Sequence, residues 1–416
     1  MYPDLIAQLS AAVRHHPDAP SPKSLEELCD TLYGASLLRE EGRPVRARVV
    51  IAPPKDFDLT GGPPSGTQVV VLATAYFLSA NEVKRLSPAA SFFHSAIAIW
   101  PDEHGKFRIW GILNTGLRWM NLVAGGRKPD GHGLPFPTIH VRDPGWLLFF
   151  NDYKMLSEWR GREFHQPGLD VFDSRLMNNR FAQIRTDLIA AIGRDRLPAT
   201  LDDSVYSELI HRVAQQFLRR VVNLMRSSGH GGTLVMIPIG ETGEEILEKW
   251  VDCKYEIDCE SVVERRVPML IAKIIKRIGL ISPAGANAEE AWDRYRNSHD
   301  ADLDLLEEGF FELARLYSDM MQVDGALILD HGLNLIGFGG EIRVGQNVIY
   351  VEQAHDLDGN TRTQWNIQSD GTRHRSMYRL CAVEPEVVGL VVSQDSNLRM
   401  IVNVENTVVF WAHSQN

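Results

Sequence analysis

The amino-acid sequence predicts an α/β protein with two mixed α/β domains. With 416 residues, the chain exceeds the size of one ordinary hydrophobic core. Its 44% hydrophobic and 23% charged residues are typical of a globular protein. Short apolar runs bounded by Gly, Pro and Asp alternate with longer stretches of helical period, which indicates strands and helices in the same domains.

The N-terminal half, residues 1–165, is predicted to be a mixed α/β domain. A helix is expected over 24–41, where leucines recur near a helical period and Ser24 and Glu27 are spaced like a capping box. A short helix is expected at 81–86. The predicted strands are 46–52, 68–75, 94–100, 107–113, 138–142 and 145–151.

Residues 166–229 are predicted to form a helical connector. Polar, proline-bearing stretches at 165–168 and 193–198 flank a helix expected over 174–192. An amphipathic helix follows over 204–226 and ends at a glycine-rich stretch.

Residues 230–416 are predicted to form a mixed β-sheet flanked by helices. The apolar run 233–237 has the composition of a strand buried on both faces. A helical insertion is expected at about 241–323, with the strongest periodicity at 262–278 and 303–321. The other predicted strands are 323–330 and 333–339, joined by an Asp330-His331-Gly332 hairpin turn, and 347–353, 387–393, 398–404 and 407–411.

Charge and composition argue against several classes of function. The 43 Lys and Arg against 54 Asp and Glu give a formal net charge of −11, which disfavours a general nucleic-acid coat or a binder of anionic membranes. Any phosphate binding must therefore come from a local positive site. No signal peptide and no apolar stretch of membrane-spanning length is recognised, so we expect no membrane partner and a cytoplasmic location.

Other features have weaker functional interpretations. The four cysteines and the His15-His16 pair lack metal-ligand spacing, so no structural metal is expected there. The Gly-rich segment 125–133 matches no Walker or dinucleotide fingerprint and is best interpreted as a connecting loop. Four tryptophans could line a ligand pocket, although buried aromatics more often belong to a core. They are Trp100, Trp110, Trp119 and Trp146.

The segment 370–376, Asp-Gly-Thr-Arg-His-Arg-Ser, concentrates a hydroxyl, two guanidiniums and an imidazole between apolar strands. Glycine lets the backbone approach a ligand, arginine offers a planar fork for phosphate oxygens, and histidine can donate or accept near neutral pH. The segment predicts a polyphosphate grip at a turn. A solvated basic loop is the alternative.

Two acidic residues complete this pattern. Asp324 is expected at the start of a strand, and Asp395 follows another strand through Ser393 and Gln394. Carboxylates that bind a divalent ion, together with arginines that bind phosphates, are typical of the active site of a nucleotidyl transferase. Either acid alone is more typical of a turn.

The order of these motifs resembles the diadenylate cyclase domain of the bacterial and archaeal enzymes that make cyclic di-AMP. The hallmarks of that family are a DGA and an RHR motif, which occur here as Asp324-Gly325-Ala326 and Arg373-His374-Arg375, after the apolar strand 232–237. The resemblance covers roughly residues 230–411. The N-terminal half is similar to the accessory domains, presumed sensors, that precede such cyclase domains.

The resemblance implies a role for each matching residue. The implied catalytic residues are Asp324, Arg373, His374 and Arg375. Gly325, Ala326, Gly371, Thr372, Arg373, His374, Arg375 and Ser393 would bind ATP. Asp324 and Asp395 would bind Mg²⁺ or Mn²⁺, and Asp324 would also position the 3′-hydroxyl.

The reaction implied by the resemblance condenses two ATP molecules into cyclic di-AMP with release of two pyrophosphates, through two in-line attacks of a 3′-hydroxyl on an α-phosphate. One domain of the family holds one ATP. A homo-oligomer is therefore needed, in which two active sites meet face to face. The expected function is second-messenger synthesis regulated by the N-terminal domain.

The sequence departs from the family pattern in three places. Gln394 and Asp395 stand where the family usually has two glutamates, and Ser376 and Met377 stand where small alanines are usual. The segment before Asp324 is also longer than in a minimal domain. Two alternatives therefore stay open: a catalytically silent nucleotide or cyclic-dinucleotide sensor, and an enzyme that joins or cleaves other nucleotides.

Overall fold

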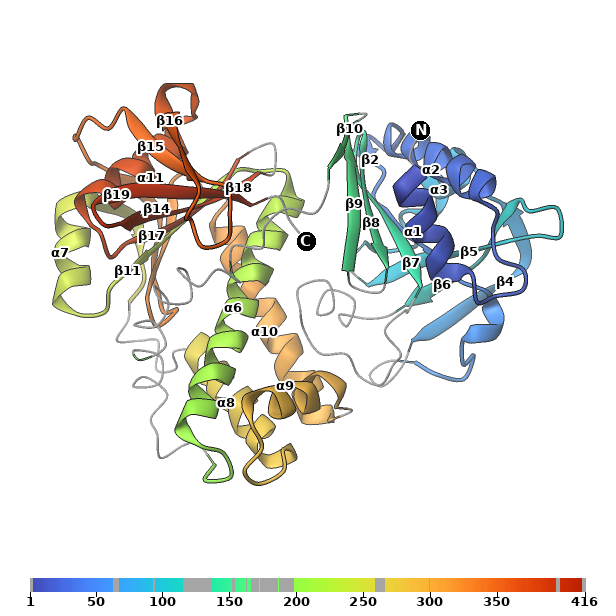
Figure 1. The fold of residues 1–416 in the computed structure, drawn as a ribbon, viewed down its shortest axis with the longest axis horizontal. Helices are drawn as coiled ribbons and strands as arrows, with labels where there is room; N and C mark the ends of the chain where they lie inside the picture. The colour runs from blue at the N-terminus through green and yellow to red at the C-terminus, as the bar shows by residue number, and fades with distance from the viewer. Residues whose placement is uncertain are drawn as a thin grey trace. The chain divides into compact units, whose positions relative to one another are not determined.

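The computed structural model contains two compact units, one centred on Met1–Gly168 and the other on Leu169–Tyr295 and Leu305–Gln415 (Figure 1). Mixed sheets with flanking helices confirm the predicted α/β class. The residues described are 3–62, 67–92, 94–114, 136–151, 154–161, 163–165, 172, 186, 198–258, 266–298, 300–393 and 397–413. The segment 125–133 and, apart from Thr186, the helix predicted over 174–192 lie outside these residues.

The sheet of the first unit contains all six strands predicted for this half. Its strands are β3 (Ala47–Ile51), β4 (Gln68–Phe77), β5 (Ser95–Pro101), β6 (Phe107–Asn114), β7 (Pro137–Asp143), β8 (Trp146–Asn151), β9 (Lys154–Arg160) and β10 (Glu163–His165). In the described residues their order is β10-β9-β8-β7-β3-β5-β6-β4, with β3 and β5 parallel.

Helices α1 (Pro3–Val13) and α2 (Pro22–Ser36) pack on the β7 to β9 part of this sheet, and α3 (Ala80–Leu86) packs on α2. The periodic residues Leu25, Leu28 and Leu32 of α2 are at most 1% exposed. The apolar face predicted from the sequence therefore forms the core between helix and sheet.

The predicted helix over 24–41 is wrong at both ends. The N-cap is Ser21, whose hydroxyl accepts a hydrogen bond from the Ser24 N–H (3.1 Å), so α2 begins earlier. The helix ends at Ser36 because the chain then forms a short hairpin of β1 (Arg39–Glu40) and β2 (Arg43–Pro44). Gly42 in the hairpin turn has φ +81°, a left-handed backbone conformation that does not occur inside a right-handed helix.

The second unit is built on a mixed sheet. Its strands are β11 (Gly232–Ile237), β12 (Val251–Glu256), β13 (Ala326–Asp330), β14 (Leu335–Ile342), β15 (Tyr350–Ala354), β16 (Arg362–Asn366), β17 (Val388–Val392), β18 (Leu398–Val404) and β19 (Thr407–His413). Among the described residues their order is β12-β14-β13-β11-β17-β18-β19-β15-β16. Strand β11 is parallel to β13 and antiparallel to β17.

Helices α7 (Glu241–Trp250) and α11 (Thr372–Val383) contribute to one core with this sheet. Met377 and Leu380 of α11 pack there with Val235 and Ile401. Alternate residues of the same strands, such as Leu234, are also fully buried. The central strands are therefore covered on both faces, as the apolar composition of β11 predicts.

The remaining helices are α6 (Asp203–Ser228), α8 (Arg266–Ile281), α9 (Ala288–Asn297) and α10 (Ala301–Met320). The predicted helical insertion at 241–323 is interrupted by β12, because Val251–Glu256 pairs with β14 at the sheet edge. Strand β16 was also not predicted. Within the described part of the chain, none of the helices combines the length and apolar composition needed to cross a bilayer.

A buried ion pair joins α6 and α10. Arg220 Nη2 donates to Glu307 Oε2 at 2.5 Å, and the two side chains are 0% and 2% exposed. The Tyr295 hydroxyl of α9 donates to the other carboxylate oxygen of Glu307. Three helices thus meet at one carboxylate whose charge is compensated inside the core.

Replacing Glu307 by leucine is expected to lower the free energy of unfolding by about 3–5 kcal/mol, because the buried guanidinium of Arg220 loses its counter-charge. Urea unfolding of the full chain, followed by circular dichroism, measures this change. The matched control is Glu312→Leu on the same helix, where an exposed pair with Arg315 is expected to contribute less than about 1 kcal/mol. Equal losses in the two variants would contradict the prediction.

Candidate functional site

The strand register brings the predicted motifs to one edge of the second sheet, namely the edge where the strands begin or end. Thr233 of β11 lies opposite Ala326 of β13 on one side and opposite Val391 of β17 on the other. Val391 in turn lies opposite Arg399 of β18. The start of β13, the end of β17 and the start of β18 therefore share one edge, and three strand spacings of ~4.8 Å put β13 and β18 ~14 Å apart.

Gly325 is fixed by a close backbone contact. Its φ is +123°, and a Cβ at this position would lie 2.4 Å from the carbonyl carbon of Gly339 in β14. Only glycine fits there. The predicted strand 323–330 begins later than expected, at Ala326, so Asp324 lies just before β13 and not inside it.

Asp324 presents its carboxylate to solvent. Its side chain is 94% exposed, and Oδ2 lies 3.8 Å from Nζ of Lys254 in β12. The same ammonium donates a hydrogen bond to the backbone carbonyl oxygen of Asp324 (3.2 Å). Because an exposed ion pair contributes only about 0–1 kcal/mol, both carboxylate oxygens stay accessible to a ligand.

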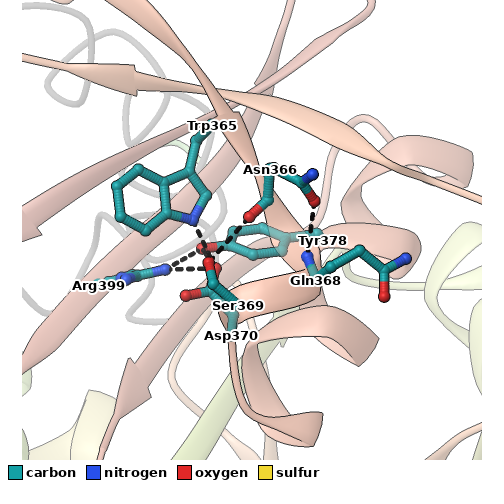
Figure 2. Close-up of polar contacts among 7 residues, drawn as sticks. All are labelled: Trp365, Asn366, Gln368, Ser369, Asp370, Tyr378 and Arg399. Atoms are coloured by element: carbon teal, nitrogen blue, oxygen red, sulfur yellow. Dashed lines mark hydrogen bonds and ion pairs between the residues drawn. The ribbon is translucent and has the colours of Figure 1, made fainter.

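Asp370, the residue before the N-cap of α11, is held by a network of hydrogen bonds and an ion pair (Figure 2). Asp370 Oδ2 accepts hydrogen bonds from Trp365 Nε1 (2.9 Å) and the Tyr378 hydroxyl (3.2 Å). It also accepts one from Arg399 Nη1 (2.6 Å), which donates to the Tyr378 oxygen as well (2.6 Å). The Asp370 side chain is only 6% exposed. Strands β16 and β18 and helix α11 are therefore joined at one carboxylate.

Burial raises the pKa of the Tyr378 hydroxyl, which consequently stays protonated. It can donate to Asp370 across the neutral pH range. The Arg399 guanidinium also lies 4.6 Å from the ring centroid of Phe410, so its charge has both an anionic and an aromatic partner.

Thr372, Arg373, His374 and Arg375 form the first turn of α11, where the sequence prediction expected a non-helical turn. The N-cap residue Gly371 offers no side chain to the free backbone N–H groups. The guanidiniums of Arg373 and Arg375 are partly exposed, and neither has an ion-pair or hydrogen-bond partner in the described part of the chain. Free backbone N–H groups and two guanidinium groups thus lie together at the N-terminus of the helix, where the helix dipole is positive. This arrangement favours the binding of an anion.

His374 differs from the flanking arginines because its side chain is only 8% exposed. Its Nε2 has no hydrogen-bond partner among the described residues. The pKa of His374 is lowered to about 4, mainly by burial and also by the charges of Arg399 and Arg373, while Asp370 opposes this shift. At pH 7 the imidazole is therefore neutral, and Nε2 can donate or accept depending on the tautomer.

Ser393 follows β17 at the same edge. Its Oγ accepts a hydrogen bond from the Asn397 N–H (3.1 Å), and its own N–H donates to the Asn397 carbonyl oxygen (2.9 Å). Gln394 and Asp395 lie between these two residues and outside the described part of the chain. Asp395 as a second metal ligand therefore stays a prediction.

The donor chemistry at this edge suits Mg²⁺ or Mn²⁺. Such ions prefer oxygen ligands, and Mg²⁺ is commonly held by one or two carboxylates together with substrate phosphates and water. The exposed carboxylate of Asp324 fits one such position. In the described ranges no group of three or more His, Cys, Asp or Glu side chains could hold an ion.

Two groups of residues at this edge were missed by sequence reasoning. Lys254 reaches Asp324 only because β12 pairs with β14, and β12 was not predicted. Arg399 lies 29 residues after Asp370 in the sequence, and Trp365, five residues before Asp370, belongs to β16, which was not predicted. Arg399 carries one available signal, since it is the one charged residue in the predominantly apolar strand Leu398–Val404.

The tryptophans of the first unit are mostly core residues. Trp110 is 6% exposed and donates through Nε1 to the Ala52 carbonyl oxygen (2.8 Å). Trp146 is 4% exposed and belongs to a different apolar cluster. His16 lies 3.3 Å from the Asp56 carboxylate and 5.1 Å from the ring centroid of half-buried Trp100. Trp119 lies outside the described residues. The core interpretation therefore holds for Trp110 and Trp146.

Comparison with known proteins gives a match in the first unit. Residues 14–114 match a family model described as "Probable sensor domain DACNV". No curated protein and no solved structure matches the chain. The match covers less than half of the chain and ends before the second unit begins. It agrees with the expectation that the N-terminal half is similar to a sensor domain.

Replacing His374 by glutamine is expected to make folding less sensitive to acid. The pKa of about 4 in the folded chain lies below the ordinary 6.5, so only the unfolded chain binds this proton between the two values. Stability therefore falls as pH decreases through this window, by about 3 kcal/mol in total at 1.36 kcal/mol per pH unit.

Urea unfolding at a series of pH values from about 7 down to about 4 measures this contribution. The control is His355→Gln, at an exposed histidine of the same unit. If His374→Gln keeps the wild-type pH dependence, the buried neutral state of His374 is wrong.

Proposed function

We propose that this protein is a diadenylate cyclase, which condenses two ATP molecules into cyclic di-AMP and releases two pyrophosphates under control of its first unit. The strand register of the second sheet carries the proposal. It brings the DGA motif that begins at Asp324 to the edge where Arg399 anchors the helix of the RHR motif, Arg373–Arg375. These motifs are far apart in the sequence and come from different elements. Their common edge is what a composite nucleotide site requires.

The first turn of α11 would hold the phosphates of ATP. Its backbone N–H groups, the Thr372 hydroxyl and the guanidiniums of Arg373 and Arg375, which have no partner among the described residues, would supply donors to phosphate oxygens. Neutral His374 could donate through Nε2 without adding charge. The Asp370 network fixes the start of the helix, so these donors would need little reorganisation when the triphosphate binds.

Asp324 would act on the other side of the site. Its exposed carboxylate would contribute an oxygen ligand to Mg²⁺ or Mn²⁺ and orient the ribose 3′-hydroxyl. The ion would supply charge neutralisation for the phosphates. Because Gly325 lies against Gly339 with no room for a side chain, any other residue at this position would displace the backbone that carries Asp324.

The chemistry requires a homo-oligomer. One site holds one ATP, whereas cyclic di-AMP contains two nucleotides joined by two phosphodiester bonds. Two copies must therefore bring their sites together, so that the 3′-hydroxyl of each ATP attacks the α-phosphate of the other.

Regulation by the first unit is supported by the family match. Residues 14–114 match a probable sensor domain, and that family is associated with diadenylate cyclases. We propose that this unit senses a signal that changes cyclic di-AMP synthesis in the second unit.

A catalytically silent nucleotide or cyclic-dinucleotide sensor is the second candidate. One observation favours it: Gln394 stands where a cyclase of this family usually has a glutamate, and an amide supplies no charge to a metal. Such a protein would keep the phosphate-binding turn of α11 and lose turnover.

Incubation of the full chain with ATP and Mg²⁺ or Mn²⁺ is expected to yield cyclic di-AMP and pyrophosphate, detected by mass spectrometry. Asp324→Asn should lower turnover by about 10²–10³-fold and keep the fold, since it removes the metal-binding charge. The control is Asp319→Asn, an exposed aspartate five residues earlier in sequence. Absence of any cyclic dinucleotide across metals and nucleotides would reject the cyclase, whereas tight ATP binding without pyrophosphate release would support the silent sensor.

Arg373→Met should weaken ATP binding by about 10–100-fold, because a charge-assisted hydrogen bond to phosphate contributes about 1.5–3 kcal/mol. Calorimetric titration with a non-hydrolysable ATP analogue measures binding separately from turnover. Arg315→Met, an exposed arginine of α10, serves as the control. Unchanged affinity in Arg373→Met would remove the first turn of α11 from the phosphate site.

A further inference from the structure

Strand β4 of the first unit combines a buried-strand composition with an exposed position. Its sequence, QVVVLATAYF, is almost entirely apolar over ten residues. A continuous apolar run of this kind is typical of a strand covered on both faces. In the single chain, however, Val70, Val71, Tyr76 and Phe77 are 46%, 50%, 51% and 59% exposed.

Neighbouring strands show the burial that this composition normally receives. All five residues of β3, Ala47–Ile51, are buried, and so are the first five residues of β5. Both strands are as rich in Val, Ile and Ala as β4 is. The exposure of β4 therefore follows from its place in the sheet and not from its residue types.

β4 is the outermost strand at one edge of the sheet of the first unit. β4 pairs with β6 on one side, and in the described residues no strand pairs with its other side. Proteins commonly protect an edge strand with charged residues or proline, and Gln68–Phe77 contains neither. One irregularity is present, a register shift between Val71 and Tyr76, which divides the pairing of β4 with β6 into two short ladders.

We infer that β4 is a self-association surface, which pairs antiparallel with β4 of a second copy of this chain about a two-fold axis. A two-fold axis makes each copy contribute the same strand, so the two surfaces are complementary by symmetry. The absence of charge in β4 means that this pairing brings no like charges together, even though each copy carries a net charge of −11. A partner that depends on charge would find no complement in this strand.

Pairing of β4 strands satisfies two needs of the first unit. It gives partners to the backbone N–H and C=O groups on the outer side of the strand, and it covers Val70, Val71 and Tyr76. It also tethers two second units in one assembly, which raises their local concentration. The interface itself does not rest on the proposed cyclase activity.

Sedimentation of the full chain over a range of concentrations tests this surface without reference to catalysis. The wild type is expected to form a dimer or a larger even-numbered assembly. The double variant Val71→Lys with Tyr76→Lys should raise the dissociation constant at least 100-fold, because it places like charges opposite one another at the axis. The control is Leu305→Lys on α10, a 72% exposed leucine, which should assemble as the wild type does.

Hydrogen exchange of the wild-type chain gives a second readout that does not depend on a variant folding correctly. The amides of 68–77 should be protected at high concentration and lose protection on dilution. The inference is overturned if the wild type is monomeric, if these amides are protected to the same degree at all concentrations, or if a folded double variant assembles like the wild type.

Discussion

The double pairing of β11 is the constraint on which the second unit depends. This strand runs parallel to β13 on one side and antiparallel to β17 on the other, and all six of its residues are buried. Because its apolar residues cannot face water on either side, its register with both neighbours is strongly specified. The parallel pair also requires a long crossover, which here includes α7, β12 and the helices α8 to α10. A slip of β11 against either neighbour would change the position of Asp324 relative to Ser393, so the candidate site depends on the core beneath it.

The buried Asp370 carboxylate is the second structural constraint on the candidate site, because it fixes the start of α11. Burying a carboxylate is unfavourable unless hydrogen bonds and an opposite charge compensate it. Trp365, Tyr378 and Arg399 provide that compensation from three different elements (Figure 2). Because Asp370 directly precedes the N-cap of α11, the same contacts determine where the helix starts. The hydrogen-bond donors in the first turn of α11 therefore belong to a helix whose start is fixed by these contacts. Asp324, in contrast, lies in a loop whose backbone is held by the contact of Gly325 with Gly339.

Elements with a strong apolar pattern could be predicted from the sequence, and those that depend on distant partners could not. β11, β18 and the apolar faces of α2 and α6 follow from composition and period. β12 and β16 contain charged and polar residues and become strands only because an edge of the sheet accepts them. The same distinction applies to the candidate site. The motif residues were recognisable locally, whereas the link between Lys254 and Asp324 and the anchoring of Asp370 by Arg399 exist only after the sheet has formed.

Net charge connects the two proposed surfaces. A chain with 54 acidic and 43 basic residues repels polyanions and other copies of itself over a Debye length of about 8 Å. An anion binds most readily where positive groups are concentrated, and Arg373 and Arg375 at the start of α11 have no acidic partner among the described residues. Two copies can approach most easily where neither carries charge, which describes β4. The overall acidity therefore restricts both where a triphosphate binds and where the protein associates with itself, and it keeps these two functions on different elements of the chain.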